Sequence, residues 1–336
     1  MLRLRGIFTV LIVLALLFCL ACLAPPVQSQ QPAAARYVYV ADVTNGLCII
    51  DVSDPAAPTE AAVYQTPKHA YDVVIAGDYA YIVDGAGLNV LDVSDPAAPA
   101  EAGVLAVSGD LTGNLVVQGD YAYVADGTQG LHIIDVSDPT APAEAGFFAM
   151  PGGSRFVEVL GSYAYVCSRP DGVTILDVSD PAAPVKVSSS AETTPEPVAL
   201  AIVGNYLYVA DSINGLCVLD VSDPGAPVLV GSLFKGMIHP HGVVPAGEYV
   251  YVLAAYPHLH VVDVSDASAP QRVAARHTPG STSEATAVGN YLYIAAGLEG
   301  LCTVDVTDPA APAEVGCFRT GGYTLGDVPP ISWRYG

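Results

Sequence analysis

The chain has 336 residues, enough for a sizeable core, and it carries 34 acidic against 12 basic residues, a formal net charge of −22. Such a surface repels phosphate backbones and anionic lipid headgroups, so we expect no nucleic-acid partner and membrane contact only through a lipid anchor. Charged residues make up only 14% of the chain while Gly (32) and Pro (27) are abundant, which favours short strands and tight turns over helices.

The first 29 residues are predicted to be an export signal and not part of the fold. Arg3 and Arg5 precede an apolar run, residues 7–20, that is short for a membrane span, and Ser29 ends a stretch of the kind that signal peptidase cuts. Residues 30–36 are expected to form a linker. The protein is therefore expected to be exported, either outside the cell or on the surface of the cell envelope.

A second interpretation of the same segment is a lipoprotein leader. Leu20, Ala21 and Cys22 resemble the lipobox of bacterial lipoproteins, although Cys19 stands where that motif usually has leucine. Lipidation of Cys22 would hold the protein firmly on a membrane. The sequence leaves both alternatives open, cleavage after Ser29 and lipidation at Cys22.

Beyond this leader, one short motif repeats with a period near 42 residues. Pairs of tyrosines keep the same spacing and account for 14 of the 19 tyrosines. A fixed period of this length predicts an array of similar structural units. The motif, DVSDP in most copies, begins at Asp51, Asp92, Asp135, Asp177, Asp220, Asp263 and Asp305.

Each unit contains four runs of strand type. In the third copy, YAYVA (121–125) alternates aromatic and small residues and GLHIIDV (130–136) is rich in β-branched residues, and the runs at 143–149 and 155–161 follow. A four-stranded sheet of this length cannot cover both of its faces, so neighbouring units must stack. Stacking that closes into a ring predicts an all-β fold, a seven-bladed β-propeller of four-stranded antiparallel blades over residues 37–328.

The phase of the repeat predicts how the ring closes. The first copy begins with its second strand at Tyr37, and the missing run falls near the other end of the chain, at residues 322–328. We therefore expect a C-terminal strand to complete the first blade and to link the two ends of the propeller noncovalently. Residues 329–336 show no strand pattern and are expected to form a tail.

The repeat resembles a known family. GLHIIDVSDPTAP (130–142), taken with YAYVAD (121–126), is similar to the LVIVD repeat, which occurs in exported and surface proteins of bacteria and archaea. The resemblance extends over seven copies, from residue 37 to about 328. It implies a propeller at the cell envelope, and it implies no particular activity, since members of this family mostly have none assigned.

The aspartates of the repeat have two interpretations. Asp and Ser oxygens are calcium ligands, but calcium requires six to eight converging oxygens and the motif offers too few. We favour a hairpin turn in which the second aspartate accepts backbone N–H bonds and the following proline presets the first turn position. The residues assigned to these turns are Asp54, Asp95, Asp138, Asp180, Asp223, Asp266 and Asp308.

The recurring tyrosines and cysteines also have a structural interpretation. A carbohydrate platform is one reading of the tyrosine pairs, but their place on the same strand of every copy favours packing between blades. Cys48 and Cys217 fit a small buried position of the repeat. Cys302 shares that position and would face Cys317 across a hairpin centred between residues 309 and 310, so these two are the candidate disulfide of an exported chain.

Candidate binding residues gather on one face of the predicted ring. In a four-stranded blade, the loop leading into the innermost strand and the loop joining the second and third strands open on the same side, here called the top face. The candidates for ligand binding on this face are His69, Tyr71, Arg155, His239, His241, Tyr256 and His258. His239 and His241 form one His-x-His pair, and His258 forms a second with His260. Imidazoles of this kind would suit zinc or copper, with His239, His241 and His258 as the candidate ligands.

Three functions are consistent with these patterns. The first is a nonenzymatic, monomeric, envelope-associated scaffold that binds a protein or a glycan through top-face loops and needs no cofactor. The second is an enzyme or a metal-binding protein with a site at the channel mouth, built from His69, Arg155, His239 and His241. The third is a purely structural envelope protein. We favour the first, because the sequence contains no recognisable catalytic constellation.

Overall fold

The computed structural model describes residues 37–107, 111–127, 129–168, 170–234, 238–256, 258–278, 282, 284–322 and 333–334. Residues 35–336 form one compact unit. The predicted leader and linker, including Cys22, lie outside the described residues. Within the described part of the chain, no helix is both long enough and apolar enough to cross a membrane.

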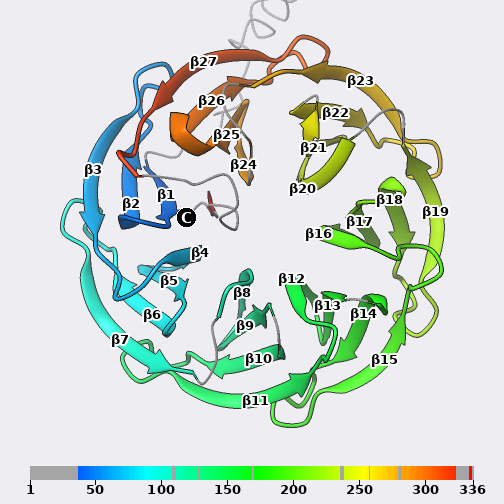
Figure 1. The fold of residues 1–336 in the computed structure, drawn as a ribbon, viewed down its shortest axis with the longest axis horizontal. Helices are drawn as coiled ribbons and strands as arrows, with labels where there is room; N and C mark the ends of the chain where they lie inside the picture. Colours follow the sequence, from blue (N-terminus) through cyan, green and yellow to red (C-terminus); the bar gives the residue numbers. More distant parts are fainter. Residues whose placement is uncertain are drawn as a thin grey trace, which may run out of the picture. The chain divides into compact units, whose positions relative to one another are not determined.

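The described strands form seven four-stranded antiparallel sheets arranged around a central axis (Figure 1). The predicted fold, an all-β propeller of seven four-stranded blades, is confirmed. In each blade the first strand lies nearest the axis and the fourth lies at the periphery (Figure 1). A single 3₁₀ turn in the described residues, η1 (Gly297–Glu299), joins the second and third strands of blade 7.

The strands follow the chain, blade by blade. They are β28 (Trp333–Arg334), β1 (Tyr37–Asp42), β2 (Gly46–Asp51) and β3 (Thr59–Tyr64) in blade 1; β4 (Ala70–Ala76), β5 (Tyr79–Asp84), β6 (Gly87–Asp92) and β7 (Ala100–Ala106) in blade 2; β8 (Leu115–Gln118), β9 (Tyr121–Asp126), β10 (Gly130–Asp135) and β11 (Ala143–Ala149) in blade 3; β12 (Ser154–Leu160), β13 (Tyr163–Ser168), β14 (Gly172–Asp177) and β15 (Val185–Ser189) in blade 4; β16 (Pro197–Val203), β17 (Tyr206–Asp211), β18 (Gly215–Asp220) and β19 (Val228–Leu233) in blade 5; β20 (Ile238–Ala246), β21 (Tyr249–Tyr256), β22 (Leu259–Asp263) and β23 (Gln271–Arg276) in blade 6; and β24 (Ala285–Val288), β25 (Tyr291–Ala295), β26 (Leu301–Asp305) and β27 (Ala313–Phe318) in blade 7.

The ring is closed by a C-terminal strand, as predicted, but by different residues. Strand β28 pairs antiparallel with β1, with Trp333 opposite Val40 and Arg334 opposite Tyr39. The closing strand therefore lies in the segment expected to be a tail, and the assignment of the closing strand to residues 322–328 was wrong. The repeat phase locates a strand only if every blade has the same connection length, and here the connection before the closing strand is longer. Of residues 322–328, only Gly322 is described.

The core consists of the interfaces between blades. Tyr39 on β1 is only 5% exposed and packs in one cluster with Ala70 and Ile82 of blade 2. The second tyrosine of each pair is buried in the same way in every blade, from Tyr39 to Tyr293. This confirms that the tyrosine pairs serve packing between blades, where large rings bury much apolar surface.

The face opposite the top face, here called the bottom face, is built from two kinds of turn. The first and second strands are joined by a Gly-X turn, such as Gly77–Asp78 with φ of +60° at the glycine, a conformation that favours glycine in tight hairpins. The third and fourth strands are joined by the DVSDP segment. The valine N–H of that segment donates to the first turn, as Val93 does to the carbonyl of Asp78 at 2.8 Å.

Both aspartates of DVSDP act as turn caps. Asp135 accepts the Ser137 N–H at 2.9 Å, and Asp138 accepts the Thr140 N–H at 3.0 Å and the Thr140 hydroxyl at 2.7 Å. The second aspartate accepts an equivalent N–H bond in all seven blades, so the turn interpretation is confirmed. Such Asx turns define the conformation of the chain without any metal ion.

We expect Asp138→Ala to lower the melting temperature by a small, measurable amount. The change removes the acceptor of two hydrogen bonds at the Thr140 turn, which lies on the surface. The hydrogen bonds of Thr140 also lower the pKa of Asp138, so protonation at acidic pH should weaken the same turn. Thermal melts of the variant and of the wild type near neutral pH test this, and identical melting curves would contradict the capping role.

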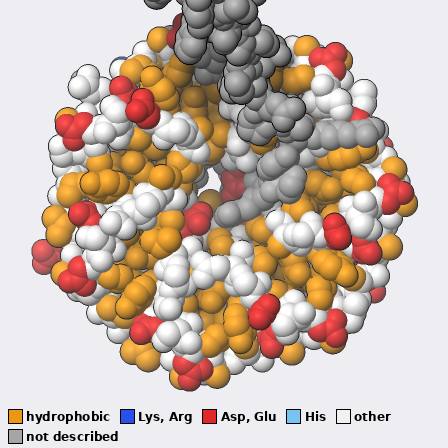
Figure 2. Space-filling view, turned by 180° about the vertical axis from the view of Figure 1, so that it is seen from behind, with side chains coloured by type: hydrophobic (Ala, Val, Ile, Leu, Met, Phe, Trp, Pro, Cys, Tyr) orange, Lys and Arg blue, Asp and Glu red, His pale blue; other side chains and the backbone are white. Residues whose placement is uncertain are grey.

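The surface of the propeller is strongly acidic. Acidic side chains recur around the periphery of the face shown in Figure 2, while basic side chains are scarce on it. This agrees with the formal charge of −22. Binding to polyanions is therefore electrostatically opposed over most of the surface.

Candidate functional site

In four blades the innermost strand carries a β-bulge near its top end. The bulge contains the residue that the sequence places at the top-face position, which is unpaired and, in β12, is followed by a second unpaired residue, Phe156. In β4, for example, Tyr71 lies between Ala70 and Asp72, which pair with Asp84 and Val83. A bulge changes the direction of a side chain, so the residue at this position does not follow the alternation of the regular strand. The four bulged top-face residues are Tyr71, Arg155, Val198 and His241.

A ring of buried aspartates supports the top face, and sequence analysis missed it. Asp42, Asp84, Asp126 and Asp211 end the second strand of blades 1, 2, 3 and 5, and each is at most 1% exposed. The signal was present in the sequence as the final letter of YVAD-like segments. The carboxylates of Asp42, Asp84 and Asp211 organise the top-face loops by accepting their N–H groups, which stabilises both the loops and the buried charge.

Asp211 shows this role most clearly. Its Oδ1 accepts the N–H groups of Ile213 and Asn214 at 2.9 and 2.7 Å, which shapes the loop between the second and third strands. Its Oδ2 accepts the N–H of Glu196 at 2.8 Å, which fixes the loop leading into the first strand. One buried side chain therefore connects the two loops that make the top face of blade 5.

Three blades lack this aspartate. The equivalent residues are Ser168 in blade 4, Ala254 in blade 6 and Ala296 in blade 7. In blade 4 the change follows from the loop sequence, because Pro170 stands two residues later, where Asp42 and Asp211 each receive an N–H, and proline has none to give. The top of blade 4 is therefore without the negative charge that blades 3 and 5 carry at this position.

The histidines gather mainly on blade 6. His241 donates a hydrogen bond from Nδ1 to the His239 carbonyl at 3.1 Å, and its Nε2 forms another with the Thr282 hydroxyl at 3.3 Å. His258 bonds to the carbonyl of Thr278 at 2.8 Å, and its ring meets His277 edge-on with 5.6 Å between centroids. These rings are bonded to loop backbone and hydroxyl groups, which fits a role in positioning the loops.

The predicted metal site is not assembled in the described residues. Within them, no three side chains of His, Cys, Asp or Glu converge on a point that could hold a metal ion. His239 is exposed and has a positive φ of 49°, while His260 is completely buried in β22. The side chain of Tyr256 lies outside the described part. The structure gives no support for zinc or copper at His239, His241 and His258.

The remaining top-face candidates belong to different blades. His69, on blade 2, is exposed and its Nδ1 bonds to the Val43 carbonyl of blade 1. Arg155 lies on blade 4 and His241 on blade 6. The catalytic grouping of His69, Arg155, His239 and His241 thus draws on three separate blades.

We expect the His241 side chain to make folding stability fall as the pH is lowered. Burial lowers the pKa of His241 from its ordinary 6.5, and nearby His258 lowers it further, against hydrogen bonds from His239 and Thr282 that raise it. As the pH falls through 6.5, the unfolded chain takes up a proton that the folded protein resists, so stability is lost until the folded pKa is reached. Urea unfolding at about pH 7.5 and about pH 5.5 should show a smaller loss for His241→Gln than for the wild type. Equal losses in the two proteins would contradict this account.

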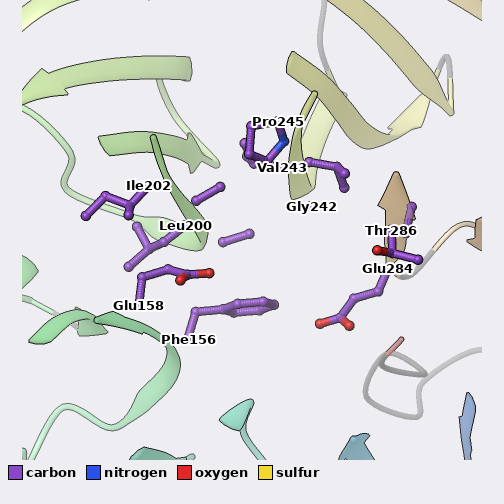
Figure 3. A pocket seen from close by; sticks show the side chains of 13 residues that line it. Phe156, Glu158, Leu200, Ile202, Gly242, Val243, Pro245, Glu284 and Thr286 are labelled. Carbon is purple, nitrogen blue, oxygen red and sulfur yellow. The ribbon is translucent and has the colours of Figure 1, made fainter. Parts of the chain in front are cut away.

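A channel opens along the axis of the propeller. A cavity of about 400 Å³ is lined by the inner strands β12, β16, β20 and β24. Figure 3 shows the Phe156 ring and the carboxylates of Glu158 and Glu284 pointing into the same space. Both glutamates have interaction partners of their own. The channel is therefore acidic, like the outer surface.

A second pocket opens on the top face between blades 3, 4 and 5. Its volume is about 300 Å³, and its lining includes Gly127, Gly153, Arg155, Ser168 and Val198. Arg155 and Val198 are two of the four bulged residues described above. Two of the top-face positions identified from the sequence therefore line this pocket.

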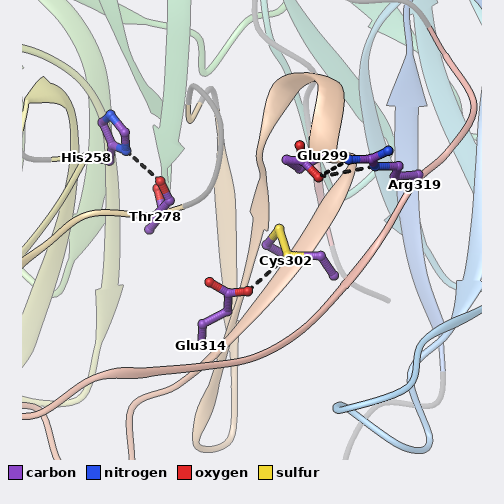
Figure 4. The surroundings of a disulfide bond; sticks show 7 residues. His258, Thr278, Glu299, Cys302, Glu314 and Arg319 are labelled. Carbon is purple, nitrogen blue, oxygen red and sulfur yellow. Dashed lines mark hydrogen bonds and ion pairs between the residues drawn. A yellow bond between two sulfur atoms is a disulfide. The ribbon is translucent and has the colours of Figure 1, made fainter.

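Cys302 and Cys317 are joined by a disulfide bond between β26 and β27 of blade 7 (Figure 4). The two residues face each other in the hairpin register, with Cα atoms 4.1 Å apart. Beside the bond, Glu299 and Arg319 form an ion pair at 2.8 Å (Figure 4). By contrast, Cys48, Cys167 and Cys217 are free and buried, and burial raises the pKa of Cys217 to about 12, so this thiol is unreactive.

Comparison with known sequences gives one match. The sequence model described as LVIVD repeat matches residues 35–66, 67–107, 108–149, 151–191, 198–234, 241–276 and 279–320. A search of curated protein sequences found no match. The seven matched segments account for most of the chain, and each coincides with one of the seven blades.

Three similar solved structures are distant in sequence from this chain. A functionally unknown protein from Desulfotomaculum acetoxidans matches with a TM-score of 0.70 at 12% identity, covering 90% of this chain and 99% of that one. BamB from Moraxella catarrhalis matches at 0.55 and 14%, covering 86% of each chain. AztD from Citrobacter koseri matches at 0.55 and 15%, covering 90% of this chain and 98% of that one. At these identities the likeness shows the fold alone.

Proposed function

The chain belongs to the LVIVD repeat family, and from that premise we propose that it is an exported, envelope-associated β-propeller that binds a protein or a glycan through its top face. In this proposal the protein acts as a monomer and as a scaffold, and it performs no catalysis. Export is inferred from the sequence of residues 1–29, with a signal peptide or a lipid anchor at Cys22 as the two routes.

One observation carries the proposal, the contrast between the two faces. The bottom face repeats the same capped turn in all seven blades, as expected for residues that serve the fold alone. On the top face, the bulged position carries Tyr71, Arg155, Val198 or His241, which differ in size, charge and hydrogen bonding. Variation confined to one face of a uniform scaffold favours recognition there.

The alternative, an enzyme or metal protein at the channel mouth, has less support. The histidines of blade 6 bond to loop carbonyl and hydroxyl groups, and the part of the chain that the structure describes contains no cluster with the donors for a metal. The proposed catalytic side chains also lie on separate blades. We therefore favour the binding scaffold.

The proposal is tested by capture from the source envelope. The purified propeller, immobilised, should retain a discrete protein or glycan, and the triple variant Tyr71→Ala, Arg155→Ala, His241→Ala should lose it. The matched control replaces three exposed alanines of the bottom turns, Ala57, Ala98 and Ala141, by glutamine. Retention by this control and by the wild type supports the top face. Equal retention by the top-face variant would contradict the proposal.

A further inference from the structure

The pocket between blades 3, 4 and 5, here called the Arg155 pocket, has a chemistry unlike the rest of this acidic protein. It is lined by Gly127, Gly152, Gly153, Arg155, Cys167, Ser168, Pro197 and Val198. Among the residues that the structure describes, the lining contains one cation and no carboxylate. The inference drawn below rests on the proposed function and names the ligand class for this part of the top face.

The guanidinium of Arg155 is available to a ligand. Arg155 is exposed, and none of its hydrogen bonds or ion pairs involves the guanidinium within the described residues. Two other basic side chains are engaged, since Lys186 pairs with Asp171 at 2.5 Å and Arg319 with Glu299 at 2.8 Å. A free guanidinium at the wall of a cavity presents a planar fork of donors that matches a carboxylate.

The backbone holds Arg155 in place. The residue lies in the bulge of β12, between the paired residues Ser154 and Val157. The carbonyl of Arg155 accepts the Asn114 N–H at 3.0 Å, and the Ser154 hydroxyl donates to the Gly130 carbonyl at 2.5 Å. Both bonds tie the bulge to blade 3. The backbone at Arg155 is thus fixed before any ligand arrives, so binding has to order only the side chain.

The repeat itself explains why an anion can enter here. Blades 1, 2, 3 and 5 place a buried aspartate at the top of the second strand, and blade 4 has Ser168 at this position. The neighbouring Asp126 does not line the pocket, and its carboxylate contacts His132 at 3.4 Å. With serine in place of aspartate, blade 4 has no carboxylate at this position beside the pocket.

The other residues that line the pocket indicate the chemistry of the uncharged part of the ligand. Ser168 and the glycines present a hydroxyl and backbone, and the apolar side chains Pro197 and Val198 are small. The Ser168 hydroxyl donates to the Gly172 carbonyl at 3.3 Å and contacts the Thr174 hydroxyl at 2.8 Å, which leaves its oxygen one lone pair for a ligand hydroxyl. A volume of about 300 Å³ is at the small end for ligand pockets. These features suit a compact, polyhydroxylated body with one negative charge.

We propose that the Arg155 pocket binds a sugar acid, with the ligand carboxylate on the Arg155 guanidinium and its hydroxyls on Ser168 and the glycine backbone. The same chemistry is presented by a free uronic acid and by the uronate unit of an acidic glycan. A single guanidinium balances one charge, so a monoanion is preferred over a polyanion at this site.

Isothermal titration of the full mature protein with galacturonate tests the proposal, with glucose and acetate as reference ligands. We expect saturable binding of galacturonate, and weaker or no binding of the neutral sugar and of the small carboxylate. Arg155→Gln should weaken binding about tenfold or more, since it removes a charge-assisted bidentate contact. The matched control Lys186→Gln removes the same charge from the outer strand of the same blade and should bind like the wild type.

A second variant adds a reciprocal test. Ser168→Asp restores the carboxylate found in four other blades, and we expect it to pair with Arg155 and to abolish galacturonate binding. If acetate binds as tightly as galacturonate, or if Arg155→Gln binds normally, the proposal is overturned. Tighter binding of an otherwise neutral oligosaccharide with a single galacturonate unit than of free galacturonate assigns the site to a glycan, and equal binding assigns it to the free acid.

Failure of this inference and failure of the proposed function are distinguishable. If galacturonate does not bind but the top-face triple variant still loses its envelope partner, the sugar-acid assignment is wrong and the scaffold function stands. If the envelope partner is retained by that variant, the proposed function is wrong whatever the titration shows.

Discussion

Replacing Asp211 with alanine is expected to lower the free energy of unfolding by about 3 kcal/mol or more. The carboxylate is completely buried and accepts the N–H groups of Glu196, Ile213 and Asn214. Alanine offers no acceptor, so three donors would be left without their partner at the top of blade 5, and each costs at least about 1 kcal/mol. Urea unfolding of the variant and the wild type measures the difference.

Two variants control for the loss of charge alone. Asp223→Ala removes an aspartate of the same blade from an exposed bottom turn, where its carboxylate accepts the Gly225 N–H at 2.9 Å. Its effect should be much smaller. Asp211→Asn keeps one acceptor oxygen and should recover part of the loss. If Asp211→Ala proved no less stable than Asp223→Ala, the buried aspartates would not organise the top face.

The second large effect is expected from the disulfide. The double variant Cys302→Ala, Cys317→Ala should lower the free energy of unfolding by about 3 kcal/mol, the value expected for a cross-link that closes a loop of about 15 residues. The sequence separation here is 15 residues. Removing the cross-link raises the conformational entropy of the unfolded chain in blade 7, which favours unfolding. Unfolding of the oxidised proteins in denaturant measures the loss.

Cys217→Ala provides the matched control, because Cys217 is a buried free cysteine at the same position of the repeat in blade 5. This variant measures the stability lost when a buried sulfur atom is removed and no disulfide is broken. A reducing agent should destabilise the wild type and leave the double variant unchanged. If the double variant loses no more stability than Cys217→Ala, or if nonreduced peptides show free thiols at 302 and 317, the bond does not contribute as argued.

The repeated residues allowed much of the fold to be predicted. The second tyrosine of each pair and the DVSDP turn recur at a fixed period, and each copy meets the same environment, so one interpretation applies to seven blades. The partner of Cys302 followed from hairpin symmetry, because a regular turn sets the register of the residues on either side.

Other features depend on contacts that the sequence pattern does not contain. The bulges at Tyr71 and Arg155 appear only once the pairing of neighbouring strands is known. The strand that closes the ring, residues 333–334, is two residues long and has no repeat pattern of its own. The Arg155 pocket needs Ser168 and Val198, which are brought together from blades 4 and 5 only by stacking.

The central claim, that the top face is the recognition surface, is tested most directly by photo-cross-linking in the source cell. A photoreactive amino acid placed at Tyr71, on the top face, should yield an adduct of discrete mass. The same amino acid placed at Ala57, in a bottom turn, should yield none. Adducts from position 57 and not from position 71 would contradict the claim.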